Sequence, residues 1–276
     1  MYINYLNYFS IKVSGEKGLV WEFLTKEYKN YISFEKAENI LKAELFLAKD
    51  ELKTSEYIVK DPISYDNKGV YIFDNKGKKA RLNFETLQNN KLHLITVDPN
   101  FHTPFLAILV EYIIYVHLLK INKILCHASG FVLNNSTILC PAWRNVGKTN
   151  LLLQFMDIGA KYISDDWCII DAQGGIEMAP KRIYLLDYNL ISFPDIIKKV
   201  NPKLLPLVDI YKDYKNGEFR IDEETIEELK NNLKFRTSPE NLFGFKRICK
   251  KTNKLDYVFY LSKNVKNSEK EVQLEK

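Results

Sequence analysis

The sequence predicts an α/β protein in which a β-rich N-terminal lobe precedes a domain built around a strand, a loop and a helix. Residues 137–140 form an apolar strand-like run, residues 142–149 form a mostly polar loop, and residues 151–156 form a helix-like run. Short alternating apolar runs recur through the first hundred positions, and a long apolar run occupies residues 105–119. Strand patterns mixed with helical ones are typical of α/β proteins.

The first hundred residues carry mainly strand patterns. We expect strands at residues 9–13, 57–59, 69–73 and 91–97, and a helix within residues 17–31. Residues 41–47 fit either structure, and we favour a strand. This part of the chain contains no catalytic motif, so we expect a β-rich lobe over residues 1–100 and the catalytic domain over residues 101–276.

The apolar run at residues 105–119 predicts a buried helix that Thr103 caps and Pro104 begins. It contains Glu111 and His117 and falls short of the ~20 residues of a membrane span. The start of the chain lacks the basic and apolar regions of a signal peptide. We therefore expect a cytoplasmic protein without a membrane partner.

Composition narrows the classes of ligand. The chain has 276 residues, of which 40 are basic and 35 acidic, so its net charge is +5. This mild and dispersed excess suits an anionic ligand such as a nucleotide and argues against nucleic acid. None of the four cysteines lies in a Cys-x-x-Cys pair, so we expect neither a disulfide framework nor a zinc site.

The loop Ala142-Trp143-Arg144-Asn145-Val146-Gly147-Lys148-Thr149 matches a phosphate-binding P-loop whose first glycine is replaced by alanine. In such a loop the backbone N–H groups and the positive end of the following helix surround a polyphosphate. Lys148 would reach the β- and γ-phosphates, and the Thr149 hydroxyl would bind Mg²⁺. Arg144 either adds charge to this site or points to solvent. The ordinary alternative is a strand, a turn and a helix with a surface lysine.

Ser164-Asp165-Asp166 follows the helix, after Gly159 at the position of a C-cap. We expect these carboxylates inside a strand over residues 161–170, where neighbouring side chains point to opposite faces unless the backbone bends. One carboxylate near a P-loop can hold Mg²⁺, and the other can accept a proton from an attacking hydroxyl. A charged strand end at the surface is the alternative.

Residues 126–133, with Asn134-Asn135 and the strand that enters the loop, predict a β-hairpin. His127 stands at the start of its first strand. A lone histidine there is more often structural than catalytic, but this hairpin delivers the chain directly to the phosphate loop. His127 is therefore a candidate site residue.

The order of these features resembles the catalytic domain of HPr kinase/phosphorylase, which shares a fold with phosphoenolpyruvate carboxykinase. The features are His-Ala-Ser-Gly, a hairpin, a P-loop, a helix that ends in Gly-Ala, and Ser-Asp-Asp. The resemblance covers about residues 125–170. It implies ATP and Mg²⁺ as cofactors, with residues 142 and 144–150 around the nucleotide. It also implies Thr149 and Asp166 at the metal, and Asp165 as the base beside His127 and Lys148. The two aspartates can exchange these roles.

Two departures separate the chain from enzymes that act on HPr. Asn150 stands where HPr kinases carry a glutamate, and their downstream Glu-Ile-Arg-Gly segment is missing. The resemblance therefore points to divergent relatives encoded beside natural-product pathways, some of which phosphorylate a peptide serine. HPr kinases form hexamers, so a homo-oligomer is also expected.

We expect a kinase that transfers the γ-phosphate of ATP to a hydroxyl of a small molecule or of a peptide serine. Lys181 and Arg182 would contact phosphates or an acidic substrate, or they belong to a solvated basic loop. The alternative function is a nucleotide-binding regulator, or an ATPase, that transfers no phosphate.

Overall fold

The chain forms a mixed α/β fold with several sheets. The computed structural model describes residues 1–5, 9–34, 41–52, 58–60, 63–65, 69–74, 76–83, 93–179 and 181–262. The first residues of the strands expected at 57–59 and 91–97 lie outside these ranges. Two compact units are present, Met1–Asn122 and Lys123–Lys276. The expected boundary at residue 100 therefore differs from the division between these units.

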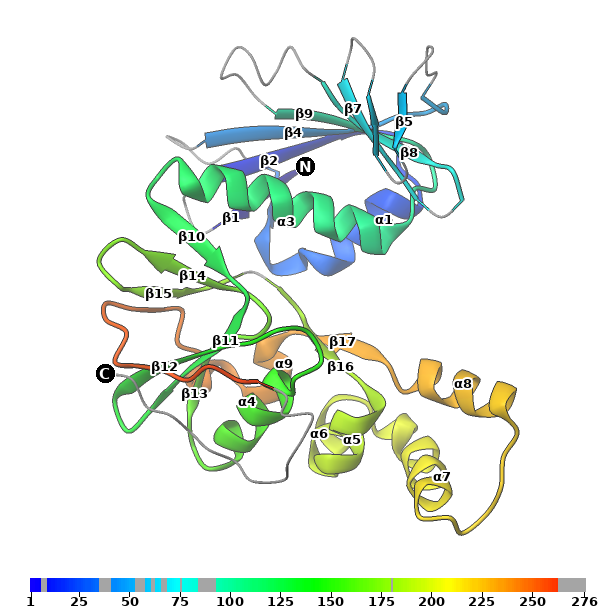
Figure 1. The fold of residues 1–276 in the computed structure, drawn as a ribbon, viewed down its shortest axis with the longest axis vertical. Helices are drawn as coiled ribbons and strands as arrows, with labels where there is room; N and C mark the ends of the chain where they lie inside the picture. The colour runs from blue at the N-terminus through cyan, green and yellow to red at the C-terminus, as the bar shows by residue number, and fades with distance from the viewer. Residues whose placement is uncertain are drawn as a thin grey trace. The chain divides into compact units, whose positions relative to one another are not determined.

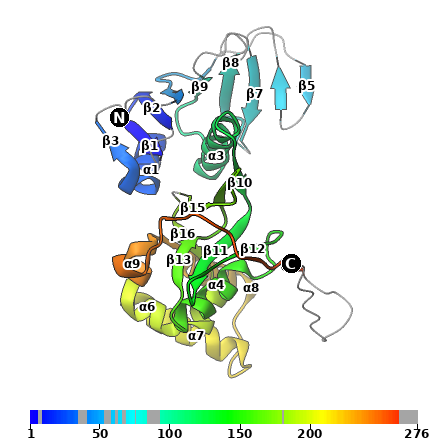
Figure 2. The same cartoon turned by 90° about the vertical axis from the view of Figure 1, so that its left-hand side faces the viewer.

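Unit 1 contains a nine-stranded sheet in the order β3-β1-β2-β4-β9-β8-β7-β6-β5 (Figures 1 and 2). Strands β2, β4 and β9 run parallel, whereas β5 to β9 pair as antiparallel neighbours. The segment at 41–47 is strand β4, as favoured from its sequence. The strands are β1 (Tyr2–Tyr5), β2 (Phe9–Gly15), β3 (Ile32–Ser33), β4 (Leu41–Leu47), β5 (Ile58–Lys60), β6 (Ile63–Tyr65), β7 (Gly69–Phe73), β8 (Lys79–Asn83) and β9 (His93–Val97).

Two helices, α1 (Leu19–Glu27) and α3 (Thr103–Leu119), lie on the same side of this sheet (Figures 1 and 2). A 3-10 turn (Lys29–Tyr31) follows α1. Thr103 is the first residue of α3 and His102 occupies the N-cap, so the expected Thr103 cap is wrong by one position. Helix α3 lies in unit 1 and not with the second domain. No helix in the described part of the chain is long and apolar enough to cross a membrane.

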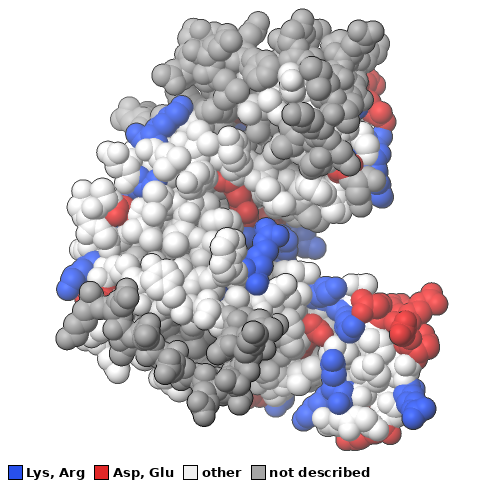
Figure 3. Space-filling view, in the orientation of Figure 1, with Lys and Arg blue, Asp and Glu red and all other residues white. Residues whose placement is uncertain are grey.

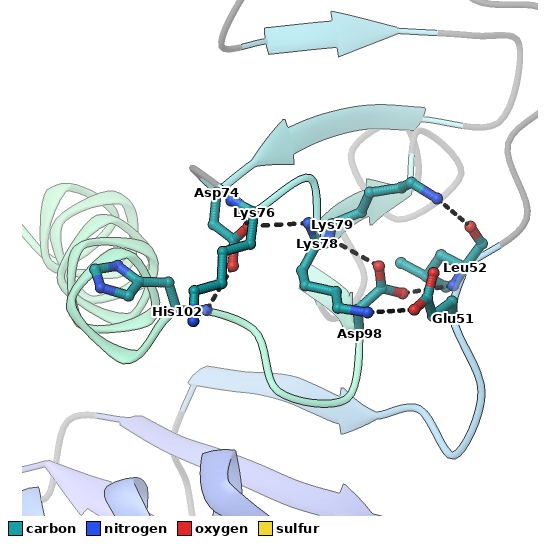
Figure 4. A network of polar contacts seen from close by, with 8 residues as sticks. All are labelled: Glu51, Leu52, Asp74, Lys76, Lys78, Lys79, Asp98 and His102. Atoms are coloured by element: carbon teal, nitrogen blue, oxygen red, sulfur yellow. Dashed lines mark hydrogen bonds and ion pairs between the residues drawn. The ribbon is translucent and has the colours of Figure 1, made fainter.

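Two buried carboxylates accept hydrogen bonds from the loops at one end of this sheet (Figure 4). Asp98 accepts backbone N–H bonds from Leu52 and Lys79 at 2.5 and 2.8 Å. Asp74 accepts the backbone N–H of His102 at 2.9 Å, which ties the turn after β7 to the start of α3. Carboxylates that accept several backbone N–H groups fix loop conformation. We interpret this network as structural.

Unit 2 contains two four-stranded sheets, β10-β14-β15-β18 and β13-β11-β12-β19, and a two-stranded sheet, β16-β17. The hairpin expected around Asn134-Asn135 is β11 and β12, and both asparagines have positive φ, as a type I′ turn requires. The strands are β10 (Lys123–Cys126), β11 (Ala128–Leu133), β12 (Ser136–Pro141), β13 (Lys161–Ser164), β14 (Cys168–Asp171), β15 (Ile176–Met178), β16 (Ile183–Leu185), β17 (Phe235–Thr237), β18 (Lys251–Thr252) and β19 (Tyr257–Val258).

Helix α4 (Lys148–Asp157) follows the loop after β12 and packs against β11, where the rings of Phe131 and Phe155 stack at 4.4 Å. Gly159 ends it with a left-handed φ of 103°. The helices that follow are α5 (Asp187–Ser192), α6 (Pro194–Val200), α7 (Leu205–Lys215), α8 (Glu223–Asn232) and α9 (Pro239–Phe243). Short 3-10 turns occupy Pro202–Leu204 and Phe245–Arg247. On the face drawn in Figure 3, acidic and basic side chains of the described residues are interspersed.

The strand expected over residues 161–170 is two strands in two different sheets. β13 pairs with β11, whereas β14 pairs with β10 and β15. The chain turns between them, where Asp166 takes a left-handed φ of 67° and the Trp167 N–H donates to the Asp165 carbonyl at 2.9 Å. The turn, and not strand alternation, therefore sets the directions of the two aspartates.

Candidate phosphate-binding and phosphotransfer site

The loop between β12 and α4 contains two residues in left-handed conformations. Asn145 and Gly147 take left-handed φ values of 62° and 104°. A Cβ on Gly147 would meet nothing within 4 Å, so glycine is favoured there by conformation and not by crowding within the protein. Ala142 forms a parallel bridge with Leu261. Extended backbone suffices at that position, which explains why alanine can replace the usual glycine.

Lys148, the first residue of α4, is buried at 5% exposure. Its Nζ donates to the carbonyl oxygens of Trp143 and Ala142 at 3.0 and 3.3 Å. Burial lowers the pKa of the Lys148 ammonium, and the charges of Asp166 and Asp165 oppose that shift. These two hydrogen bonds hold the Lys148 ammonium against the loop that the sequence predicts to bind phosphate.

Thr149 and Asp165 meet although sixteen positions separate them. The Thr149 hydroxyl donates to Asp165 Oδ2 at 2.9 Å. Asp165 is 4% exposed, and its Oδ1 has no hydrogen-bond partner among the described residues. Burial, and then the charge of Asp166, raises the pKa of Asp165 to about 7. A buried carboxylate with a free oxygen beside a hydroxyl is a suitable partner for a cation.

Asp166 lies close to two other candidate residues. Its carboxylate lies 3.9 Å from His127 Nε2 and 3.6 Å from Lys181 Nζ. Asp166 is 36% exposed at its side chain, so an incoming molecule can reach it more readily than Asp165. The turn after β13 thus gives the neighbouring carboxylates different surroundings.

His127 lies in the bend between β10 and β11, just before the hairpin strand. Its ring is 5.1 Å from that of Trp167, in a tilted arrangement. Burial, followed by the charge of Lys148, lowers the pKa of His127, so the imidazole is neutral near pH 7. A neutral imidazole beside a carboxylate can relay a proton.

The remaining predicted residues divide into two groups. Arg144 is exposed on the loop, and its charge contributes to the lowered pKa of Lys148, so it lies within electrostatic reach of the site. Lys181 joins the site through Asp166. The Arg182 guanidinium donates to the main-chain carbonyl of Arg236 on β17.

Sequence reasoning missed the start of α5. Asn189, 1% exposed, donates from Nδ2 to Asn150 Oδ1 at 2.6 Å, directly after Thr149. Tyr188 precedes it and is 41% exposed. The segment carries no motif, so its only sequence signal was a polar pair in an otherwise apolar run.

Among the described residues, no group of three or more histidine, cysteine, aspartate or glutamate side chains could hold a metal ion. Mg²⁺ does not require one, since it usually binds through one or two carboxylates together with water and substrate phosphates. Thr149 and Asp165, with the unpartnered Oδ1, provide donors of that kind.

Comparison with known proteins adds little. No protein-family model matches the chain, and no curated protein sequence matches it. Among 25 matching chains of solved structures is the HPr(Ser) kinase/phosphatase from Coxiella burnetii, at 15% identity and a TM-score of 0.31. The match covers 52% of this chain and 63% of that one, which is less than two thirds of its length. A TM-score of 0.31 is too low to establish a shared fold or function.

Proposed function

We propose that unit 2 is an ATP- and Mg²⁺-dependent phosphotransferase whose acceptor is an alcohol, carried by a small molecule or by a peptide serine. The observation that carries this proposal is the contact of Thr149 with Asp165 at 2.9 Å beside the buried Lys148. A P-loop hydroxyl together with a carboxylate at the end of a neighbouring strand is the arrangement that holds Mg²⁺ in P-loop NTPases.

The loop and the start of α4 would bind the triphosphate. Residues 143–147 would supply backbone N–H groups, and the ten-residue helix that begins at Lys148 would add its positive end. Lys148 would exchange its bonds to the two loop carbonyls for the β- and γ-phosphates, which are stronger acceptors because they are charged. Arg144 and Asn145 would complete the phosphate contacts.

Thr149 and Asp165 would hold the metal. Magnesium bound there neutralises charge on the β- and γ-phosphates during transfer. This proposal differs from the roles expected from the resemblance, in which Asp166 accompanies Thr149. It is preferred because the Thr149 hydroxyl donates to Asp165, and because Oδ1 of that buried carboxylate has no hydrogen-bond partner in the described part of the chain.

Asp166 would then act on the acceptor. The acceptor oxygen forms a bond to the γ-phosphorus while the bond to the bridging oxygen breaks, so that ADP leaves and the hydroxyl proton passes to Asp166. Neutral His127, 3.9 Å away, can take up that proton in turn, and Lys181 Nζ lies 3.6 Å from the same carboxylate.

One experiment tests the proposal. MgATP affinity is measured by calorimetry, and transfer of labelled γ-phosphate is measured across hydroxylated metabolites and seryl peptides. We expect Lys148→Ala to weaken MgATP binding at least tenfold, with exposed Lys161→Ala as the matched control. We expect Asp166→Asn to keep that affinity and to lower the transfer rate by 10²-fold or more.

Each contrary result has a distinct meaning. If Lys148→Ala kept full affinity for MgATP, the nucleotide would not bind at this loop. Tight binding without transfer to any acceptor would favour the nucleotide-binding regulator. If Asp165→Asn loses transfer at unchanged Mg²⁺ dependence while Asp166→Asn does not, the two aspartates have the opposite roles.

A further inference from the structure

The start of α5 is held from both sides by side-chain hydrogen bonds. Tyr211 on α7 donates its hydroxyl to Asp187 Oδ2 at 2.7 Å. Asn189 donates to Asn150 on α4 at 2.6 Å, and its Oδ1 accepts the Leu186 backbone N–H at 2.8 Å. Since Asn189 is buried, breaking these bonds would leave an unsatisfied amide. The backbone of Tyr188, between the two anchors, is therefore well fixed.

These contacts connect the backbone next to Tyr188 with the proposed transfer site. Asn189 bonds the residue that follows Thr149, and Thr149 bonds Asp165. Burial and the negative charges of Asp187, Asp165 and Asp166 raise the pKa of the Tyr188 phenol, so all three carboxylates lie within electrostatic reach of it. At 41% exposure, part of the ring remains open to an incoming molecule.

We infer that Tyr188 contacts the phosphate acceptor and selects an alcohol with a flat apolar group next to its hydroxyl. This inference rests on the proposed function, and it adds the acceptor class. A single exposed tyrosine on a protein surface needs no explanation. The anchored backbone distinguishes Tyr188 from such a residue, because a ring on a fixed backbone offers a stacking surface at low entropic cost.

Two matched pairs of probes test the inference. They are N-acetyl-Phe-Ser-amide against N-acetyl-Ala-Ser-amide, and phenyl against methyl β-D-glucoside. For the full chain with MgATP we expect kcat/KM to be about five- to tenfold higher for the aromatic member, as one ring–ring contact allows. Tyr188→Ala should remove this preference by raising KM, with kcat and MgATP affinity kept, and Tyr188→Phe should restore it. Tyr184→Ala is the control, since Tyr184 is 37% exposed and faces Arg236 at 5.2 Å.

The possible outcomes distinguish a failure of the Tyr188 inference from a failure of the proposed phosphotransferase function. An aromatic preference that survives in Tyr188→Ala, no preference in the wild type, or phosphorylation of none of the four probes while MgATP binds would each overturn the inference alone. A wild-type protein that binds no MgATP would overturn the proposed function and the inference with it. The calorimetric measurement detects this case because it does not involve Tyr188.

Discussion

The carboxyl group of Asp165 is buried with one oxygen bonded to Thr149 and the other without a partner among the described residues. Such a group favours the neutral form, which is why its pKa rises from 3.8 to about 7. A bound cation would favour the charged form and reverse this shift. Asp165 thus lowers the stability of the free protein, but it suits a protein with a bound cation. Functional residues often reduce stability in this way.

This burial predicts a pH dependence of stability. Between about pH 4 and 7 the native state holds a proton on Asp165 that the unfolded chain releases, so the free energy of unfolding falls as pH rises through this range. We expect Asp165→Asn to have a higher Tm than the wild type at pH 8 and an equal Tm near pH 4, as measured by calorimetry without nucleotide. Asp209→Asn, at an exposed position on α7, is the control. A constant difference between wild type and Asp165→Asn at both pH values would contradict this account.

At the scale of an element, the β11–β12 hairpin determines where the phosphate loop begins. Its strands pair in register from Ala128–Pro141 to Leu133–Ser136, with Asn134 and Asn135 in left-handed conformations at the turn. Two residues with positive φ form the type I′ turn, whose twist matches that of the strands. Register set at this turn is carried to Pro141, immediately before Ala142.

A substitution in the turn tests this role. Because Asn-Gly is the preferred type I′ pair, Asn135→Gly should raise the free energy of unfolding by about 0.5–1 kcal/mol, with MgATP affinity unchanged. The control is Asn216→Gly at the end of α7, where φ is −77° and glycine should destabilise by about 0.5–1 kcal/mol. Urea denaturation followed by circular dichroism measures both. Equal destabilisation by the two glycines would show that the hairpin does not depend on its left-handed turn.

At the scale of the whole molecule, the chain is two compact units, each with its own buried side chains. Leu45 on β4 and Leu152 on α4 are both 0% exposed, in unit 1 and unit 2 respectively. The proposed nucleotide site lies entirely within unit 2. Ligand binding should therefore stabilise one unit more than the other.

Differential scanning calorimetry checks this expectation. Leu45→Ala should destabilise one transition by about 2–5 kcal/mol and leave in place the transition that MgATP raises. Leu152→Ala should do the reverse, which makes it the matched control. A single transition that both substitutions lower equally would mean that the units unfold as one cooperative structure.

Local features were determined by the sequence itself. Short-range rules account for the strand, loop and helix around residues 142–149, the Asn134-Asn135 hairpin, the end of α4 at Gly159 and the run that becomes α3. Glycine and asparagine favour positive φ, β-branched and aromatic residues favour strands, and a continuous apolar run favours a buried element. These preferences act over a few residues, so they can be read without knowing what the segment will pack against.

Long-range pairing was decided only by the tertiary structure. It divided residues 161–170 between two sheets, placed α3 in unit 1, and set Asp165 rather than Asp166 against Thr149. It also brought Asn189 to Asn150, thirty-nine positions away, and with it Tyr188. Neighbouring aspartates have the same local preferences. Only the turn at Asp166, stabilised by contacts between distant strands, makes one of them buried and the other accessible.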